Sequence, residues 1–191
     1  IDISNNTLLR NLLCANNQLS TLDVSNNLNL RTLVCSNNMI TNLDLLNHHN
    51  FNDGGIACDF NQLTSLYISD SITVLKGFSF SHNLIDTINF TRTNRDTSLI
   101  IEDAFDISNN QFTYFQLGRL YPSVEFFIDS NQLESLDLRV DPSLGYNSNS
   151  LDYISAHHNP DLSCVSVDDT TYSNVNWTSL NGFYFDPQVS F

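Results

Sequence analysis

Three of the four cysteines stand at comparable places along the chain and are the first candidates for chemistry. Cys14, Cys35 and Cys58 follow one another at intervals of 21 and 23 residues. Cysteines at regular spacing can form disulfides, bind a metal ion or pack as small apolar side chains. Equivalent side chains of stacked segments point in parallel and meet poorly for a disulfide, so we expect three buried free thiols. Cys164 is expected to face outward, where a half-exposed thiol suggests a partner.

Two other groups of residues could in principle carry chemistry. The histidine pairs His48-His49 and His157-His158 have no Cys, His or carboxylate at a familiar zinc-ligand spacing, so we expect solvent-facing loop histidines. Ser79 follows a glycine two residues earlier, but a nucleophile elbow needs a second glycine where Ser81 stands. Metalloprotease, phosphate-binding and dinucleotide motifs are absent from the sequence. The sequence therefore predicts that the protein is not an enzyme.

A row of aspartates is the remaining candidate for ion binding. Asp2, Asp23 and Asp44 each stand between two apolar residues and recur every 21 residues. Carboxylates stacked about 4.8 Å apart repel one another unless cations or hydroxyl groups intervene. A bridging calcium ion is possible, but a solvated acidic face is favoured. The hydroxyl groups that would relieve the repulsion belong to Ser4, Thr21 and Ser25. We therefore expect no cofactor and no bound metal.

Composition limits the class of protein and its partners. The 191 residues include 21 acidic and 7 basic side chains, a net charge of −14, which disfavours nucleic acid and anionic membranes as partners. Hydrophobic residues make up 41%, enough for a core, yet no apolar run is long enough to span a membrane. Asn, Ser and Asp are abundant and favour turns over helices. The repeat already runs at Ile1, so the lack of a visible signal peptide says nothing about localisation.

One short pattern recurs along almost the whole chain. The segment from Leu12 to Leu19 reads L-L-C-A-N-N-Q-L, and the segment from Leu33 to Ile40 reads L-V-C-S-N-N-M-I. Further copies begin at Ile56, Phe78, Phe105, Phe126 and Ile154. The fifth residue after each start is always asparagine: Asn17, Asn38, Asn61, Asn83, Asn110, Asn131 and Asn159. A fixed period of this kind predicts a solenoid.

A second, looser half alternates with the first. Its apolar triplets begin at Ile1, Leu22, Leu43, Leu66, Ile88, Phe115, Leu136 and Val165. The fifth residue of this half varies, so the two halves are inequivalent and the repeat unit is the pair, about 21 residues. The distance from a first half to the next second half is 10 residues in six cases and 11 in the last, whereas the return takes 11 to 18. Insertions therefore lie on one edge of the solenoid.

The alternation of apolar residues predicts short strands whose alternate side chains point inward. Two strands per coil would enclose one apolar layer that is closed only by stacking on neighbouring coils. The asparagine after each first-half strand can turn inward to bond backbone groups at the bend, which would cost about 1–3 kcal/mol each if left unpaired. We therefore expect an all-β, right-handed solenoid of about seven and a half coils, with two parallel sheets of short strands and little helix. Residues 1–167 would form the solenoid, and residues 168–191 a C-terminal cap of the same domain.

The consensus L-x-x-L-x-C-x-x-N-x-L-x-x-L-D-L/V resembles the bacterial leucine-rich repeat with a nested half-repeat, of the kind found in Bacteroidetes. The resemblance extends from Ile1 to about Val167, and residues 159–169 with Trp177 and Phe191 look like the closing segment of such proteins. It implies secretion and attachment to the cell surface through a further C-terminal segment. The chain departs from the family pattern in its insertions and where phenylalanine replaces the usual leucine, at Phe78, Phe80, Phe105 and Phe126.

The two longest insertions suggest where a ligand binds. Thr91–Ala104 and Arg139–Tyr153 lead into first-half strands that stand two coils apart, about 10 Å. Loops that rise over a rigid scaffold often carry binding residues, so the insertions would flank a notch. The predicted ligand-binding residues in this notch are Asp106, Glu125, Phe127, Asp129, Tyr153 and Ser155.

The sequence thus predicts a monomeric, non-catalytic recognition or adhesion module of a secreted or cell-surface bacterial protein, binding a protein partner. It predicts neither nucleic-acid binding nor membrane insertion. One alternative is a polysaccharide-binding module, whose outward aromatic side chains would be Tyr67, Tyr114, Phe127 and Tyr153. Another is a structural spacer without a ligand.

Overall fold

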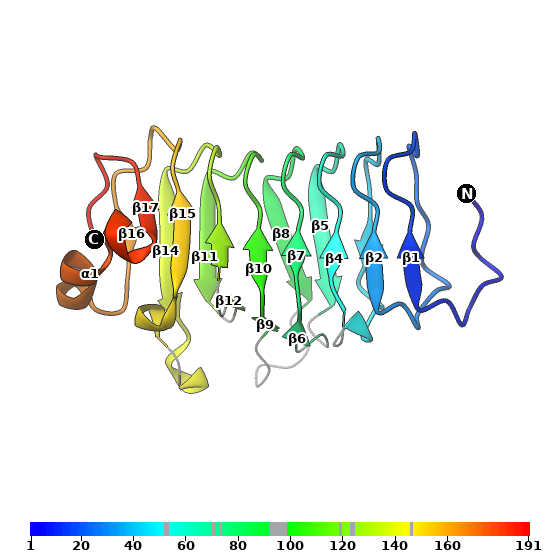
Figure 1. The fold of residues 1–191 in the computed structure, drawn as a ribbon, viewed down its shortest axis with the longest axis horizontal. Coiled ribbons are helices and arrows are strands. Elements are labelled where there is room, and N and C mark those ends of the chain that lie inside the picture. Colours follow the sequence, from blue (N-terminus) through cyan, green and yellow to red (C-terminus); the bar gives the residue numbers. More distant parts are fainter. Residues whose placement is uncertain are drawn as a thin grey trace.

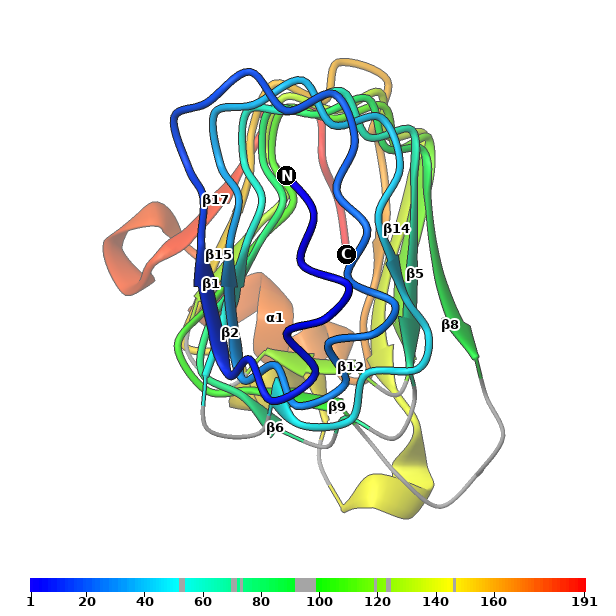
Figure 2. The same cartoon turned by 90° about the vertical axis from the view of Figure 1, so that its right-hand side faces the viewer.

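The computed structural model describes residues 1–51, 54–69, 72, 74–91, 99–118, 120–122, 125–145 and 147–191. These residues form an all-β solenoid whose coils stack side by side from one end to the other (Figure 1). The chain rises through the front strands of Figure 1 and descends behind them as it advances, so the solenoid is right-handed. Seen along its axis, the coils surround one continuous apolar core (Figure 2). Within the described ranges, no helix is long and apolar enough to cross a membrane.

One side of the solenoid is a long parallel sheet that follows the predicted repeat. Leu12 pairs with Leu33, Leu33 with Ile56, and Ile56 with Phe78, so residues at the same offset in each first half lie side by side. Each strand is short because the chain turns directly after its two inward-pointing residues. In spatial order they are β1 (Asn11–Leu13), β2 (Thr32–Val34), β4 (Ile56–Ala57), β7 (Phe78–Ser79), β10 (Ala104–Asp106), β13 (Glu125–Phe127), β15 (Tyr153–Ala156) and β17 (Phe183–Phe185).

The opposite side is divided, where the sequence analysis expected one continuous second sheet. Its strands form two parallel sheets: β3 (Asp44–Leu45), β5 (Ser65–Ser69) and β8 (Thr87–Thr91), and then β11 (Tyr114–Gly118), β14 (Ser135–Val140) and β16 (Val165–Ser166). The first two coils, whose residues are all described, have no strand on this side, and their aspartates bond the turn that follows. Asp2 accepts a hydrogen bond from the Ser4 amide at 3.0 Å, and Asp23 accepts one from the Ser25 amide at 2.9 Å.

Some of the inserted residues form short strands of their own. The connections that precede Phe78, Phe105 and Phe126 contain β6 (Val74–Leu75), β9 (Leu99–Ile101) and β12 (Leu120–Pro122), which pair in parallel in the order β12-β9-β6. The middle coils therefore have a third side along the lower edge of Figure 1. Residues 92–98 of the longest insertion lie outside the described residues.

The asparagine ladder is confirmed, and it joins neighbouring coils as well as closing each bend. The Nδ2 of Asn83 donates to the carbonyls of Phe80, at 3.1 Å, and Cys58 of the preceding coil, at 3.0 Å. Its Oδ1 accepts from the amide of Leu63 at 3.0 Å. The same arrangement recurs at Asn38, Asn61, Asn110, Asn131 and Asn159. These six ladder residues thus satisfy backbone groups in two coils at once, whereas Asn17 of the first coil bonds carbonyls of its own coil.

The residue before each ladder asparagine has a left-handed backbone. Its φ lies between 53° and 57° in all seven coils, at Asn16, Asn37, Phe60, His82, Asn109, Ser130 and His158. Asparagine tolerates this conformation better than other residues with a side chain, and phenylalanine poorly. The ring of Phe60 stacks on that of His82, with centroids 4.0 Å apart and planes inclined by 17°. This contact offsets part of the conformational cost of two large residues at positive φ.

Two residues of the second half also bond buried backbone groups, which the sequence analysis did not predict. Asn27 is fully buried and donates to the carbonyls of Ile3 and Asn6 at 3.0 and 2.9 Å. His48 takes the same place in the next coil, with Nε2 3.2 Å from the carbonyl of Val24. The expectation that His48 faces solvent is therefore wrong, although its neighbour His49 is exposed. In these two coils the fifth position of the second half faces the inside of the bend, as it does in the first half.

The buried His48 predicts an acid-sensitive fold. Burial lowers the pKa of the His48 imidazole, opposed by the Val24 carbonyl and by Asp44, while His49 lowers it further. The unfolded chain therefore binds a proton below about pH 6.5 before the folded chain does, and stability falls as the pH drops through that range. The loss should reach at most about 1.4 kcal/mol per pH unit. His48→Asn should reduce it, measured as the difference in urea unfolding between pH 7 and pH 5. His49→Asn is the exposed control; an equal change there would contradict the assignment.

The core changes in character along the axis. At the N-terminal end Cys14, Cys35 and Cys58 are buried, as predicted, without a disulfide. Burial raises the pKa of the Cys14 thiol and places that of Cys58 well above its usual range, helped by Cys35. These shifts favour the protonated form of the Cys14 and Cys58 thiols. Cys164 is exposed, also as predicted.

Phenylalanines fill the middle of the core at positions where the other first-half strands have leucine or isoleucine. Phe105 lies between Phe78 and Phe126, with ring centroids 5.1 Å from each, and Phe115 of the opposite side is 5.9 Å away. All but Phe115 are at most 1% exposed. The substitutions thus occur together in successive coils, where each large ring packs on the next.

The C-terminal segment adds a rung to the long sheet. Residues 168–191 hold helix α1 (Thr170–Asn176), a 3-10 turn (Ser179–Asn181) and β17. Asp169 caps α1 by accepting from the Tyr172 amide at 3.0 Å. Trp177 follows the helix and stacks on Phe183 at a centroid distance of 5.0 Å. The sequence analysis predicted a cap here but not this strand, because Phe183–Phe185 is not followed by a ladder asparagine.

Candidate functional site

The predicted ligand-binding residues lie on the outer face of the long sheet. Asp106 pairs with Phe127, and Phe127 with Ser155, so these three form one row across β10, β13 and β15. Glu125 pairs with Tyr153 in the row beside it. The structure therefore brings the predicted residues together on three adjacent strands.

Neighbouring aromatic side chains extend along this face as far as the last strand, β17. The ring of Tyr153 lies 5.3 Å from that of Phe127 and 5.6 Å from that of Tyr184, and the His157 ring lies 5.5 Å from Tyr184. We call Phe127, Tyr153, Tyr184 and His157 the aromatic row. All four side chains are partly exposed. The sequence analysis missed Tyr184, although the alternation of Phe183, Tyr184 and Phe185 resembles a first-half strand. It assigned His157 to a loop, and His157 does follow the end of β15, where its ring lies beside that of Tyr184.

Asp129 and Ser155 have a structural contact that the sequence did not reveal. The Ser155 hydroxyl donates to Asp129 Oδ1 at 2.5 Å, and the His157 amide donates to the same oxygen at 2.9 Å. Ser155 is only 8% exposed, so it is not the open floor of a notch as expected. Asp129 therefore links the end of β13 to β15, and it is itself partly exposed.

Carboxylates lie near the aromatic row, and burial raises the pKa of two groups there. Burial raises the pKa of Asp106, and the charges of Asp59 and Asp129 raise it further, against the hydrogen bond from the Ser108 amide. Burial also raises the pKa of Tyr153, followed by the effects of Tyr184 and Asp129. Both shifts have the direction expected where negative charges face a partly desolvated group.

The insertions do not flank this face as the sequence analysis expected. The 3-10 turn at Pro142–Leu144, yellow in Figure 2, projects below the coils on the side opposite the long sheet. Asp168 holds this insertion there, because its Oδ2 accepts from the amides of Ser148 at 2.7 Å and Val140 at 3.4 Å. The notch wall predicted from Arg139–Tyr153 is therefore absent from the aromatic row. The other wall, predicted from Thr91–Ala104, falls largely outside the described residues.

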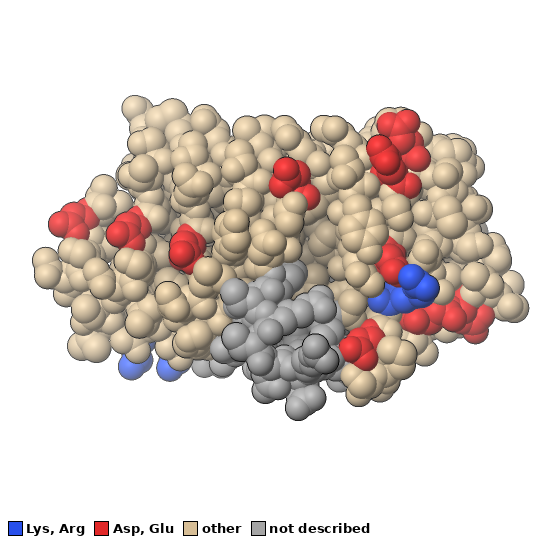
Figure 3. Space-filling model, turned by 180° about the vertical axis from the view of Figure 1, so that it is seen from behind, with Lys and Arg blue, Asp and Glu red and all other residues tan. Residues whose placement is uncertain are grey.

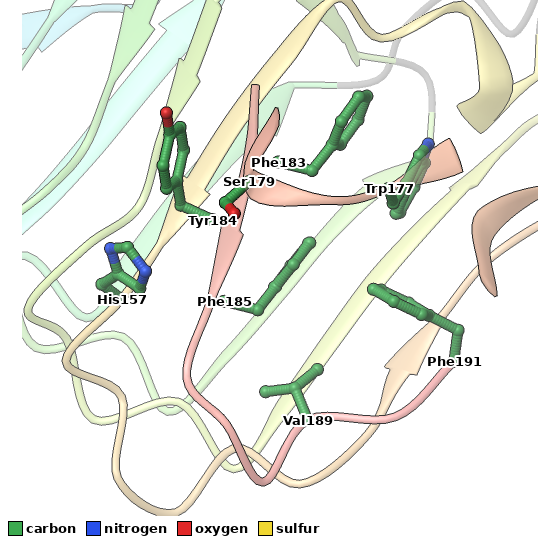
Figure 4. Close-up of a pocket in the computed structure, with 8 residues that line it drawn as sticks. All are labelled: His157, Trp177, Ser179, Phe183, Tyr184, Phe185, Val189 and Phe191. Atoms are coloured by element: carbon green, nitrogen blue, oxygen red, sulfur yellow. The ribbon is translucent and has the colours of Figure 1, made fainter. Parts of the chain in front are cut away.

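A pocket of about 260 Å³ continues the aromatic row around the end of the sheet. His157 and Tyr184 line it together with Trp177 and Phe191 (Figure 4). Phe191 meets Trp177 edge to face at a centroid distance of 5.4 Å, and the Trp177 ring is almost parallel to that of Phe183. The pocket therefore offers flat apolar walls beside the exposed rings of the last two strands.

The carboxylates of the aspartate row on the opposite side accept hydrogen bonds from amides of their own turns. Asp44 repeats the pattern of Asp2 and Asp23 by accepting from the Leu46 amide at 2.9 Å. Figure 3 shows this side of the molecule, with separate acidic side chains spread over it and few Lys or Arg. Over the part of the chain that the structure describes, no three His, Cys, Asp or Glu side chains are placed to hold a metal ion.

Ser79 and Ser81, which stand in the incomplete nucleophile-elbow pattern, are hydrogen-bonded to a carboxylate. The Ser79 and Ser81 hydroxyls both donate to Asp59 Oδ1, and the Ser81 amide donates to the same oxygen at 3.0 Å. Ser81 is buried, and its Oγ lies 3.3 Å from Nδ1 of His82. With Asp59 accepting from the hydroxyls of the next coil, the arrangement matches the contact between Asp129 and Ser155. These hydrogen bonds act as a cross-link between neighbouring coils.

No family model matches the chain, and no curated protein matches its sequence. Among solved structures, the chain is similar to the functional domain of InlJ from Listeria monocytogenes, a structure described as including a cysteine ladder. The identity is 18% and the TM-score 0.39, over 99% of this chain and 56% of that one, so this chain spans little more than half of its length. By its own repeat and strand register, the chain is an all-β solenoid of the leucine-rich-repeat type.

Proposed function

We propose that the chain is a non-catalytic recognition module that binds a protein partner through the outer face of the long sheet, from β10 to β17. The observation that supports this most is the aromatic row, four neighbouring rings partly exposed on a rigid sheet. Exposed aromatic side chains on a fixed backbone lose little entropy on binding and often dominate the affinity of protein interfaces. Secretion or display on a cell surface belongs to the same proposal and follows from the resemblance of the repeat.

Polysaccharide binding is the second candidate, favoured by a different part of the surface. Tyr114 is 51% exposed on the side opposite the aromatic row. Gln116 and Asp137 stand next to it on β11 and β14, and Arg139 donates to both oxygens of Asp137, at 2.9 and 2.7 Å. An aromatic ring beside such planar polar groups suits a sugar, with its apolar face and ring of hydroxyl groups.

Phe127→Ala tests the proposed function. The change should weaken binding to a captured protein partner by more than about 1 kcal/mol, as expected of an aromatic anchor. It should lower the melting temperature by no more than about 4 °C, because Phe127 points away from the core. The partner would be isolated by pull-down and its affinity measured by calorimetry, in parallel with a glycan array.

Tyr114→Ala is the matched control on the other side. Loss of glycan binding in Tyr114→Ala, with no effect of Phe127→Ala on any ligand, would favour the polysaccharide alternative. A partner that binds both variants as tightly as the parent would place the site elsewhere.

A further inference from the structure

We propose that the aromatic row binds an extended segment of the partner that carries arginine side chains. This inference rests on the proposed function and names the chemistry of its partner. It is carried by the rings on β13, β15 and β17 together with the carboxylates that border them.

The rings are arranged to receive flat cationic groups. Phe127, Tyr153 and Tyr184 follow one another along the solenoid axis at centroid distances of 5.3 and 5.6 Å, with planes inclined by 48° and 47°. Such inclined, partly exposed rings leave faces open between neighbours. A guanidinium group stacks on such faces by cation–π attraction, and arginine does so more often than lysine.

Carboxylates border the rings on both sides. Glu125 and Asp152 are exposed at the beginning of β13 and β15, and Asp106 and Asp129 are partly exposed near the ends of β10 and β13. The strands β10, β13, β15 and β17 contain no Lys or Arg, so none of their own cations neutralises this charge. Of the four described basic residues, Arg139 belongs to the opposite side, where it is paired with Asp137, and Arg10, Arg31 and Lys76 stand just before β1, β2 and β7. These carboxylates would not attract a neutral sugar, whereas they would attract a cationic segment from both sides of the rings.

The dimensions suit an extended chain that runs along the solenoid axis. The four strands from β10 to β17 span three strand spacings, about 14 Å. Alternate side chains of an extended peptide lie about 6.6 Å apart, so arginines two residues apart can reach successive rings. The pocket beyond Tyr184, lined by Trp177 and Phe191, would then take an apolar residue at the end of the same segment.

The test uses a fluorescent peptide of roughly eight residues in which arginine and serine alternate, and a second peptide with citrulline in place of arginine. Citrulline keeps the planar shape and removes the charge. Fluorescence anisotropy should show binding of the arginine peptide that weakens as NaCl is raised, and binding of the citrulline peptide at least about tenfold weaker. Tyr153→Ala and Glu125→Gln should each weaken binding several-fold, whereas Tyr114→Ala and Asp44→Asn on the opposite side should not.

Two outcomes would overturn the inference: equal binding of the two peptides, or equal losses from the variants on both sides. Absence of arginine-peptide binding would also overturn it. If a captured partner still depends on Phe127 while the arginine peptide fails to bind, the partner chemistry is wrong and the proposed function stands. If nothing depends on Phe127, both are wrong.

Discussion

Replacing Phe105 by alanine should lower the free energy of unfolding by about 3–5 kcal/mol. The Phe105 ring is fully buried and contacts the rings of Phe78, Phe126 and Phe115. Its removal would leave a cavity lined by rigid rings that collapse poorly, because each is fixed by its own neighbours in the stack. Phe105→Leu, which restores the residue usual in this repeat, should cost much less. Urea unfolding followed by circular dichroism measures both.

Phe127→Ala is the matched control for this prediction. Phe127 stands on the neighbouring strand, one residue further along, and points to the outer face. Its truncation should change the unfolding free energy by no more than about 1 kcal/mol, as for a partly exposed side chain. Comparable losses at Phe105 and Phe127 would mean that the strand faces are assigned wrongly.

Asn83→Ala should destabilise the protein by about 2–4 kcal/mol. The substitution removes the acceptor for the Leu63 amide and the donor for carbonyls of two coils, and Asn83 is 5% exposed. Each buried backbone group left without a partner costs about 1–3 kcal/mol. Because the bonds join two coils, hydrogen exchange should increase at the amides of both, including that of Leu63.

Asn29→Ala is the control for the ladder. Asn29 also bonds the preceding coil, donating to the Thr7 carbonyl at 2.9 Å, but it is exposed. Water can replace that bond, so the change should be within about 0.5 kcal/mol of neutral. If Asn29→Ala were as costly as Asn83→Ala, burial would not be what gives the ladder its energy.

The local features of the fold were predictable because they depend on spacing alone. The constant offset between a strand start and Asn83 or its equivalents fixes which side chain meets the bend, whatever the rest of the chain does. The same spacing placed Cys14, Cys35 and Cys58 in the core. The pairing of Asp106 with Phe127 and of Glu125 with Tyr153 followed as well, since register in a stacked repeat is set by the repeat itself.

The features that were missed depend on contacts between segments without a common spacing. The direction of the Arg139–Tyr153 insertion is set by Asp168, which lies 28 residues beyond Val140 and bonds its amide. His48 is buried because its bend closes on the Val24 carbonyl, although a histidine pair in a polar stretch looks solvent-exposed.

The aromatic row shows most clearly which features the sequence determined and which the tertiary structure added. Sequence alone determined that Phe127 and Tyr153 stand on adjacent strands and face outward, because strand periodicity fixes the side on which each residue points. Only the tertiary structure added Tyr184, since β17 follows a helix and a turn and has no ladder asparagine to mark it. Its place as the next rung was decided by backbone pairing with β15 and by the packing of Phe183 on Trp177, both of which require the folded chain.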